Sequence, residues 1–302
     1  LILEEARKNN LDPWLVRAII DESSLTIRWM QERGVVFTDA TINMIDSPRT
    51  YHVVKGRGEA IIRTLALLAK SKGVGILPGV PVTGLLKEDG RICGVSVDDG
   101  GREAEVACKA VMIATGGFAN NREWIKKYSG HELDVNLVPI GNTGKMGDGI
   151  RMAWEAGAAE AGIGVLELFR VAPVGPEFST YNEIEICAMQ PDLWVTASGK
   201  RFCDETIGFW DTHVGNANAR VGRNGYTWSL MDDSIFGGLM RDGIAKNISV
   251  EFLPGYKPVN VLQEIQAAID NGSTELVAAD SLEELAAKMG TDPVVLRATV
   301  DD

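Results

Sequence analysis

The residues best placed to do chemistry follow a short apolar run at Val111–Ala114. Thr115, Gly116 and Gly117 come next, and the two glycines leave bare backbone at what we expect to be a tight turn. A large flat or phosphorylated ligand can approach such a turn without meeting a Cβ atom. The pattern therefore predicts a short strand that ends in a ligand-binding turn.

Further polar and aromatic residues follow later in the chain. Asp148 stands between two glycines, and Arg201 and Glu205 belong to a Gly-Lys-Arg-Phe-x-x-Glu motif. We interpret Arg201 and Glu205 as an internal ion pair that shapes its domain rather than as catalysts. Phe209 and Trp210 come next, and they suit either stacking on a flat, weakly charged substrate or packing in a core.

Composition excludes several classes of function. The net charge of −12 over 302 residues argues against a surface that binds nucleic acid. No apolar run reaches the roughly 18 residues that a membrane-spanning helix needs. The four cysteines form no Cys-x-x-Cys pair and the three histidines are scattered, so we propose no metal site. The compartment stays open, cytoplasmic or exported to the cell envelope.

The first half of the chain must position these motifs with helices and a small sheet. Asp12-Pro13 predicts a capped helix that stops near Gly34, and apolar spacing predicts a second helix over about Gly58–Lys72. Two Asp-Gly turns favour a three-stranded meander. Its strands are expected at Val82–Leu86, Ile92–Val97 and Glu103–Cys108, before helices that begin near Asn120 and over Gly149–Ala156.

The character of the sequence changes after Gly164. Proline and glycine become frequent, and we expect no helical periodicity until Val259. Short strands are predicted near Leu193–Val195 and Tyr226–Met231. Three helices should close the chain, one of them begun by a capping box at Ser281. We place a domain boundary near Leu166.

A glycine-rich segment before the second helix could bind a dinucleotide phosphate. Gly56 and Gly58 follow a strand-like run and precede a helix, but Ile61 occupies the place where close packing requires a third glycine or alanine. The segment is better interpreted as a helix start. A nicotinamide-dependent dehydrogenase that uses this loop stays an alternative.

Together, the order and spacing of these motifs resemble the flavoprotein subunits of the fumarate reductase/succinate dehydrogenase family, in particular the soluble flavocytochrome and urocanate reductase branch. The resemblance runs from about Asn10 to the C-terminus. It implies an α+β protein: the rear part of a Rossmann-like FAD-binding domain with its β-meander over residues 1–165, and an α+β substrate-capping domain over residues 166–302. It also implies that the phosphate-binding loop and a last flavin-domain segment lie outside these 302 residues.

The same resemblance assigns roles to particular residues. The cofactor is FAD. The backbone of Val82 would hold the adenine, and Asp148 would lie near the flavin. The diphosphate and ribityl region would lie against Ala114, Thr115, Gly116 and Gly117. Glu185 matches the glutamate of the relatives' proton relay, whereas Ala188 replaces the arginine of that relay; Arg170 is the candidate replacement acid.

The sequence departs from the family where fumarate would bind. An aromatic stands where fumarate-reducing relatives carry a proton-donating arginine, and their substrate-binding histidine is absent near Ala172-Pro173. A dianion needs such groups to clamp both carboxylates. The resemblance therefore implies reduction or dehydrogenation of an activated carbon–carbon bond in another small molecule, with an electron-donor protein as a second partner. A non-catalytic binding or assembly module with the same fold stays a further alternative.

Overall fold

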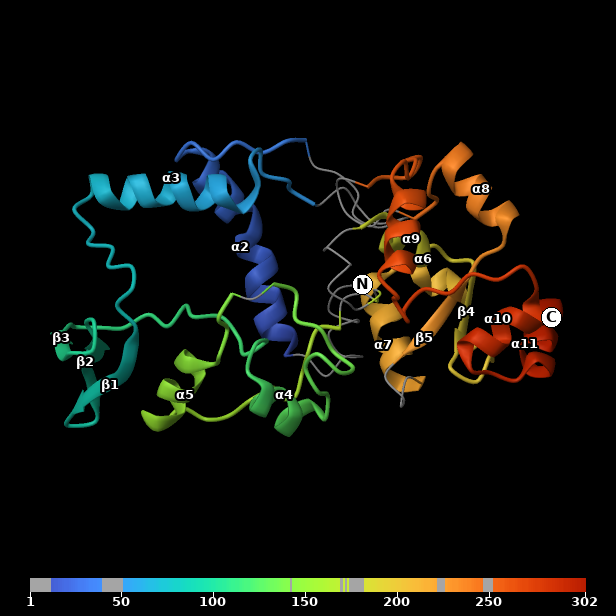
Figure 1. Ribbon diagram of the computed structural model, residues 1–302. Helices are drawn as coiled ribbons and strands as arrows, with labels where there is room; N and C mark the ends of the chain where they lie inside the picture. Colours follow the sequence, from blue (N-terminus) through green and yellow to red (C-terminus); the bar gives the residue numbers. More distant parts are fainter. Residues whose placement is uncertain are drawn as a thin grey trace. The chain divides into compact units, whose positions relative to one another are not determined.

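A computed structural model describes residues 12–39, 51–141, 143–168, 171, 173, 182–221, 226–246 and 252–302 (Figure 1). The chain divides into two compact units, Leu1–Pro78 and Gly79–Asp302. Helices and small antiparallel sheets alternate through it, so the fold is α+β as the sequence predicts. The boundary near Leu166 stays a prediction.

The first unit contains helices α2 (Pro13–Gln31) and α3 (Arg57–Ser71). The Asp12 side chain accepts a hydrogen bond from the Trp14 N–H at 2.9 Å, and Pro13 begins the helix, so the predicted cap is confirmed. Gly56 precedes α3 with a φ of 87°, a left-handed conformation that favours glycine. The glycine-rich segment is therefore the start of a helix.

The second unit opens with the predicted meander. Strands β1 (Val82–Glu88), β2 (Arg91–Asp98) and β3 (Glu103–Ala107) pair in that order, each antiparallel to the next. The first turn works because Asp89 and Gly90 both adopt positive φ, 46° and 80°, as a two-residue hairpin requires. The strand β3 lies at the edge of this sheet.

The strand expected at Val111–Ala114 is wrong: this run has no regular secondary structure and is paired with no described strand. A strand needs a neighbour for its backbone hydrogen bonds, and apolar composition alone does not provide one. Helix α4 (Arg122–Ser129) begins two residues after Asn120, near the predicted start, and Asn121 caps it because its side chain accepts the Trp124 N–H at 3.0 Å. Helix α5 (Asp148–Glu155) agrees with the prediction to within one residue.

The C-terminal lobe, by which we mean the described residues from 182 to 302, mixes short strands with helices. Strands β4 (Leu193–Thr196) and β5 (Thr227–Leu230) form a two-stranded ladder, as expected. The absence of helices before Val259 is wrong, since α6 (Glu183–Ala188), α7 (Asp211–Val221) and α8 (Asp233–Asp242) all precede it. The three closing helices are confirmed as α9 (Val261–Asp270), α10 (Leu282–Met289) and α11 (Pro293–Asp301), and Figure 1 shows α10 beside α11.

Two clusters of buried side chains stabilise this lobe. One joins α6, α8 and α9 through residues such as Ile186, Leu239 and Val261. The other packs Val195 of β4 against Ala286 and Leu296 of the last two helices. Between Gly79 and 168 the buried cluster is smaller and centres on Phe118, Ile125 and Leu133. Among the described helices, none has the length and apolar character needed to cross a bilayer.

Candidate functional site

The predicted ligand-binding turn lies at the surface. Ala114, Thr115, Gly116 and Gly117 are all exposed. Gly116 has a φ of 75°, and a Cβ atom added at Gly117 would meet no atom within 4 Å. Buried Phe118 follows at once and fixes this bare stretch of backbone to the core.

The first turn of α5 packs directly against this stretch. A Cβ atom on Gly149 would lie 2.2 Å from Thr115 Oγ1 and 2.4 Å from Ile113 Cγ2, so only glycine permits the contact. On the other side of Asp148, a Cβ atom on Gly147 would lie 2.6 Å from the Trp124 ring. The two glycines therefore place exposed Asp148 next to the predicted turn, at a helix N-terminus where a carboxylate is favoured.

Hydrogen bonds hold the approach to α5 in place. The Asn120 N–H donates to Lys145 O, and the Lys145 N–H donates to Asn120 Oδ1, both at 3.0 Å. Asn121 Nδ2 donates to Met146 O at 2.8 Å. The loop before Asp148 thus has a fixed path relative to the residues that follow the glycine turn.

Helix α5 also contacts the start of the meander. Arg151 Nη2 donates to the carbonyl of Thr83 at 3.2 Å, one residue after Val82. Val82 itself is exposed at the beginning of β1. The structure therefore brings Val82, the turn at 114–117 and Asp148 to one helix, although they are far apart in sequence.

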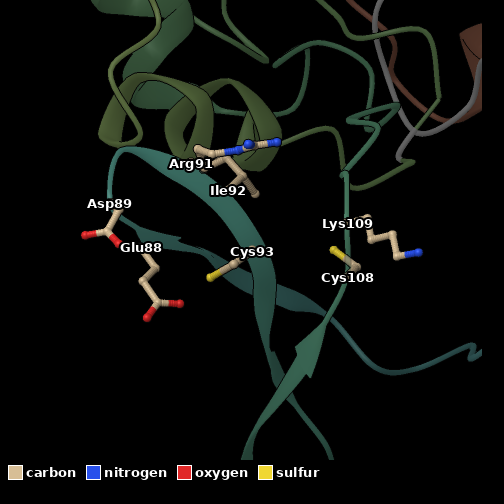
Figure 2. A pocket seen from close by; sticks show the side chains of 7 residues that line it. All are labelled: Glu88, Asp89, Arg91, Ile92, Cys93, Cys108 and Lys109. Atoms are coloured by element: carbon tan, nitrogen blue, oxygen red, sulfur yellow. The ribbon is translucent and has the colours of Figure 1, made fainter.

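A shallow pocket of about 430 Å³ lies elsewhere on the meander (Figure 2). Its lining residues are Glu88, Asp89, Arg91, Ile92, Cys93, Cys108 and Lys109. The pocket contains none of the predicted site residues.

Glu185 is buried on α6, a short helix whose start is held by side chains. Asn182 Oδ1 accepts the Glu185 N–H at 2.7 Å, and Glu264 Oε2 accepts the N–H groups of Glu183 and Ile184 at 2.7 and 3.1 Å. These bonds satisfy the free amides at the helix start. The backbone of Glu185 is therefore fixed in the core, while Arg170 lies outside the described residues.

The Glu183 carboxylate links α6 to the segment before α9. It accepts hydrogen bonds from the Tyr256 hydroxyl at 2.6 Å and from the Asn260 N–H. The hydrogen bond to Glu183, followed by burial, raises the pKa of Tyr256 to about 12. A phenol that binds its proton this firmly acts as a donor to Glu183 over the physiological range.

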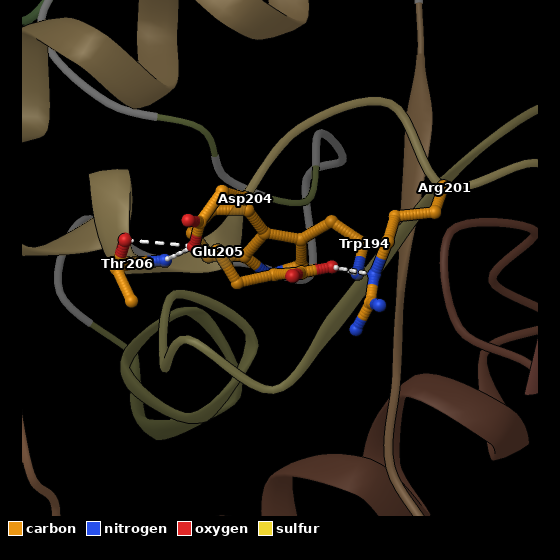
Figure 3. Close-up of polar contacts among 5 residues, drawn as sticks. All are labelled: Trp194, Arg201, Asp204, Glu205 and Thr206. Atoms are coloured by element: carbon orange, nitrogen blue, oxygen red, sulfur yellow. Dashed lines mark hydrogen bonds and ion pairs between the residues drawn. The ribbon is translucent and has the colours of Figure 1, made fainter. Parts of the chain in front are cut away.

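Arg201 and Glu205 form the predicted ion pair, with Arg201 Nε 3.0 Å from Glu205 Oε1 (Figure 3). The same oxygen accepts the Trp194 N–H at 3.2 Å. Glu205 is buried, whereas the Arg201 side chain is 47% exposed. Next to this pair, hydrogen bonds from Thr206 hold the pKa of Asp204 below its usual value. The pair ties β4 to the 3₁₀ turn η1 (Glu205–Phe209), which agrees with a shaping role.

The two aromatic residues after the motif have different surroundings. Phe209 ends η1 and is half-buried, while Trp210 is 41% exposed, with its ring centroid 5.9 Å from that of His213. Trp210 therefore offers a face to a ligand, and Phe209 contributes partly to packing.

Lys246 is a buried charged residue that the sequence does not predict. Lys246 is only 1% exposed, and Gln190 holds its backbone: Gln190 Oε1 accepts the Lys246 N–H at 2.9 Å, and Gln190 Nε2 donates to Lys246 O at 3.3 Å. The same amide nitrogen of Gln190 also donates to Ile186 O of α6 at 3.0 Å. Buried lysine is rare, but no local pattern around Lys246 distinguishes it from a surface lysine.

Comparison with known proteins gives the family. The FAD binding domain family matches residues 2–254. The chain belongs to this family. The resemblance to the fumarate reductase flavoproteins is confirmed as well, since the chain is 26% identical over 295 residues to a fumarate reductase (cytochrome) of Shewanella frigidimarina, covering 92% of this chain and 48% of that protein.

Two further relatives cover most of the chain. A vinyl phenol reductase of Lactiplantibacillus plantarum is 30% identical over 291 residues, which are 93% of this chain and 58% of the reductase. The crystal structure of a 3-ketosteroid-Δ4-(5α)-dehydrogenase from Rhodococcus jostii RHA1 matches with a TM-score of 0.66 at 18% identity, over 96% of this chain and 59% of that one. The chain thus spans about half the length of the relatives it matches.

FAD is the cofactor of this family, and the residues around α5 fit part of it. The exposed, side-chain-free backbone at Gly116 and Gly117 can lie against a phosphate or ribityl group, as a flavin-binding turn must. The packing of Gly149 on Thr115 holds this stretch against the first turn of α5. No described residue fills the space beside the added Cβ position of Gly117.

Proposed function

We propose that the protein is an FAD-dependent oxidoreductase that reduces or dehydrogenates an activated carbon–carbon bond in a small conjugated molecule other than fumarate. The observation that carries the proposal is the bare turn at Ala114–Gly117, exposed and packed on the first turn of α5 beside Asp148, in a chain of the FAD binding domain family.

The first part of the chain would hold the cofactor. The backbone of Val82 would contact the adenine, the turn at 114–117 would lie along the diphosphate and ribityl groups, and Asp148 would lie near the flavin. When bound, FAD supplies the group that accepts or donates the hydride. The finer architecture belongs to the same proposal: the rear part of a Rossmann-like domain over residues 1–165 and a substrate-capping domain over residues 166–302.

The C-terminal lobe would select the substrate. Trp210 presents an exposed aromatic face in the stretch where an aromatic replaces the arginine of fumarate-reducing relatives. An aromatic surface favours flat, weakly charged molecules and does not neutralise a dianion. The names of two relatives agree with this, since vinyl phenol and the 4-androstene-3,17-dione bound in the ketosteroid dehydrogenase structure are both conjugated and uncharged. We propose a conjugated alkene or enone as the substrate class.

The proton would come from the same lobe. Glu185 is buried on a helix whose start is fixed by Asn182 and Glu264, so its position is well defined. A carboxyl group held in a defined place can pass a proton to a reacting carbon, which is the role we propose for Glu185. Arg170 is the second candidate acid. An electron-donor protein would complete the reaction as partner.

Substrate preference tests the proposal directly. The natural protein that carries this sequence, purified with its flavin, is reduced and mixed with a panel of alkenes under anaerobic conditions. We expect faster flavin reoxidation by a vinyl phenol or a conjugated enone than by fumarate. Oxidation by fumarate alone would contradict the substrate class, and a protein inert to the entire panel would favour the non-catalytic alternative.

The role of Glu185 requires its own variant. Glu185→Gln should lower kcat about 100-fold or more, the usual contribution of a general acid or base, and flatten the pH profile of kcat. Glu275→Gln, at an exposed position of the same lobe, is the matched control and should leave both unchanged. An unchanged kcat in folded Glu185→Gln would remove this residue from the proposal.

The nicotinamide alternative has less support. Gly56 caps α3 as a left-handed residue, and the region matches an FAD-binding family. If titration of the isolated chain with NAD(P) shows no binding, the nicotinamide-dependent alternative is wrong.

A further inference from the structure

Two cysteines of the meander lie opposite each other on paired strands. The Cys108 N–H donates to the carbonyl of Cys93 at 2.8 Å, which extends the ladder by one residue beyond the pair Gly94–Ala107. Directly opposed residues of this hydrogen-bonded kind have Cα atoms about 5.5 Å apart. Their side chains project from the same face of the sheet. The two thiols are therefore neighbours by register.

This spacing suits a covalent bond between them. Disulfides join residues whose Cα atoms are about 4.4–6.8 Å apart, and the expected separation falls inside that range. In a hydrogen-bonded pair the Cβ atoms lie at the wide end of the usual range, about 5.5 Å apart, whereas a disulfide needs about 3.5–4.5 Å, so the two strands must approach each other by about 1–2 Å. The strand β3 can adjust because it is the edge strand, paired on one side only.

Both thiols are accessible. Cys93 and Cys108 are unbonded and half-buried, and both line the open pocket at the β1–β2 hairpin (Figure 2). Arg91 and Lys109 line the same pocket, but so do Glu88 and Asp89, so their charges offset one another. Access and register, rather than local charge, thus distinguish this pair.

The other two cysteines have less reactive surroundings. Burial, followed by the charge of Glu183, raises the pKa of Cys187 to about 12. Burial, followed by Glu205, raises the pKa of Cys203 to about 11. Because the thiolate is the attacking species, both thiols exchange slowly at neutral pH.

We propose that Cys93 and Cys108 form a reversible disulfide site that is oxidised by a low-molecular-weight disulfide. One cysteine thiolate attacks the small disulfide, forms a mixed disulfide and releases one small thiol. The second cysteine then attacks the protein sulfur of that mixed disulfide and releases the other small thiol. The two cysteines lose two protons and two electrons, and the small disulfide gains them. Oxidation would fasten β3 to β2, and it needs neither the flavin nor the proposed reaction.

Peptide mapping tests the site. The purified chain is equilibrated with mixtures of glutathione and glutathione disulfide, quenched by alkylation and digested with trypsin without reduction. Cleavage after Arg91, Arg102 and Lys109 separates the cysteines into peptides 92–102 and 103–109. We expect these two peptides to be linked, in a fraction that follows the ratio of glutathione disulfide to glutathione and returns to zero with excess glutathione.

Matched variants make the result decisive. Cys93→Ser and Cys108→Ser should each abolish the link and accumulate the glutathione adduct on the remaining cysteine. Cys187→Ser and Cys203→Ser should leave the linked fraction unchanged. Stable adducts on both meander cysteines of the unaltered chain, with no linked peptide, would overturn the proposal, as would a link that includes Cys203.

Discussion

The C-terminal lobe and the segment around the glycine turn treat their backbone polar groups in opposite ways. In the lobe, side chains satisfy the backbone: half-buried Glu264 accepts the amides at the start of α6, and buried Glu205 accepts the Trp194 N–H. At 114–117 the backbone is left exposed, and glycines keep side chains away from it. In the lobe these backbone groups bind the protein's own side chains, whereas the turn has the exposed backbone expected of a binding site.

This difference predicts which substitutions should destabilise each region. In the turn the main constraint is space, because glycines at 147 and 149 permit close contacts. In the lobe the constraint is that buried polar groups need hydrogen-bond partners. Removal of a partner lowers the free energy of unfolding. Four predictions test this contrast.

The largest effect is expected for Gly149→Val. Its Cβ atom would come within 2.4 Å of both Thr115 and Ile113, so the turn and α5 must separate. We expect the free energy of unfolding to fall by about 3 kcal/mol, at the upper end for overpacking, and the small gain in helix propensity does not offset this. Urea denaturation measures it. Gly117→Ala, where a Cβ meets nothing, is the control; equal loss in both would refute the spatial argument.

The next largest effect is expected for Tyr256→Phe, which should lower the free energy of unfolding by about 2 kcal/mol, because the buried Glu183 carboxylate loses the hydrogen bond that the Tyr256 hydroxyl donates. The raised pKa of Tyr256 adds a pH dependence. Between pH 10 and about 12 the folded state retains a proton that the unfolded chain loses, so stability falls as pH rises through this window.

Tyr256→Phe should remove the contribution of this residue to that alkaline slope. Thermal melts of both proteins from pH 8 to pH 11 would measure the difference. Identical slopes would show that Tyr256 keeps its ordinary pKa of 10.

The Arg201–Glu205 pair allows a comparison within one contact. Glu205→Ala should cost about 1–2 kcal/mol, because it leaves the buried Trp194 N–H without its acceptor. Arg201→Ala should cost less than about 1 kcal/mol, because its side chain is half exposed. Chemical denaturation of both variants measures the two losses in free energy of unfolding. A larger loss for Arg201→Ala would mean that the ion pair contributes more to stability than the hydrogen bond to Trp194.

The smallest effect is expected for Arg151→Ala. Arg151 pairs with Glu155 at 2.8 Å on the exposed side of α5 and donates to Thr83 O. Exposed pairs of this kind contribute about 0.3–0.5 kcal/mol. A loss above about 1.5 kcal/mol in urea denaturation would mean that the link between α5 and β1 matters more than its exposure suggests.

Local signals predicted much of the fold. The meander follows from its Asp-Gly turns, and the caps at Asp12 and Ser281 follow from residue types that bind amides two or three positions ahead. The ion pair of Arg201 with Glu205 was also predicted from sequence. In each case the residues that decide the structure are close in the chain.

The wrong predictions concern elements that depend on residues far apart in the chain. The start of helix α6 depends on Glu264, which accepts the Glu183 N–H from 81 residues away in sequence. Helix α7 contains glycine and asparagine, and α8 contains two adjacent glycines; these are weak helix formers, so tertiary packing overrides propensity there. Buried Lys246 depends on Gln190, 56 positions away. The roles of Val82, Asp148 and Glu185 stay predictions, because family motifs assign them and geometry only brings some of them together.

The dependence of α6 on Glu264 has a consequence during synthesis. The helix that carries Glu185 acquires the acceptor for its first amides only after a long stretch of further chain has left the ribosome. Closing such a distant contact is slow compared with local helix formation. A nascent chain that pauses before α9 would therefore expose an unfinished lobe, and that interval is when chaperones would have most to bind.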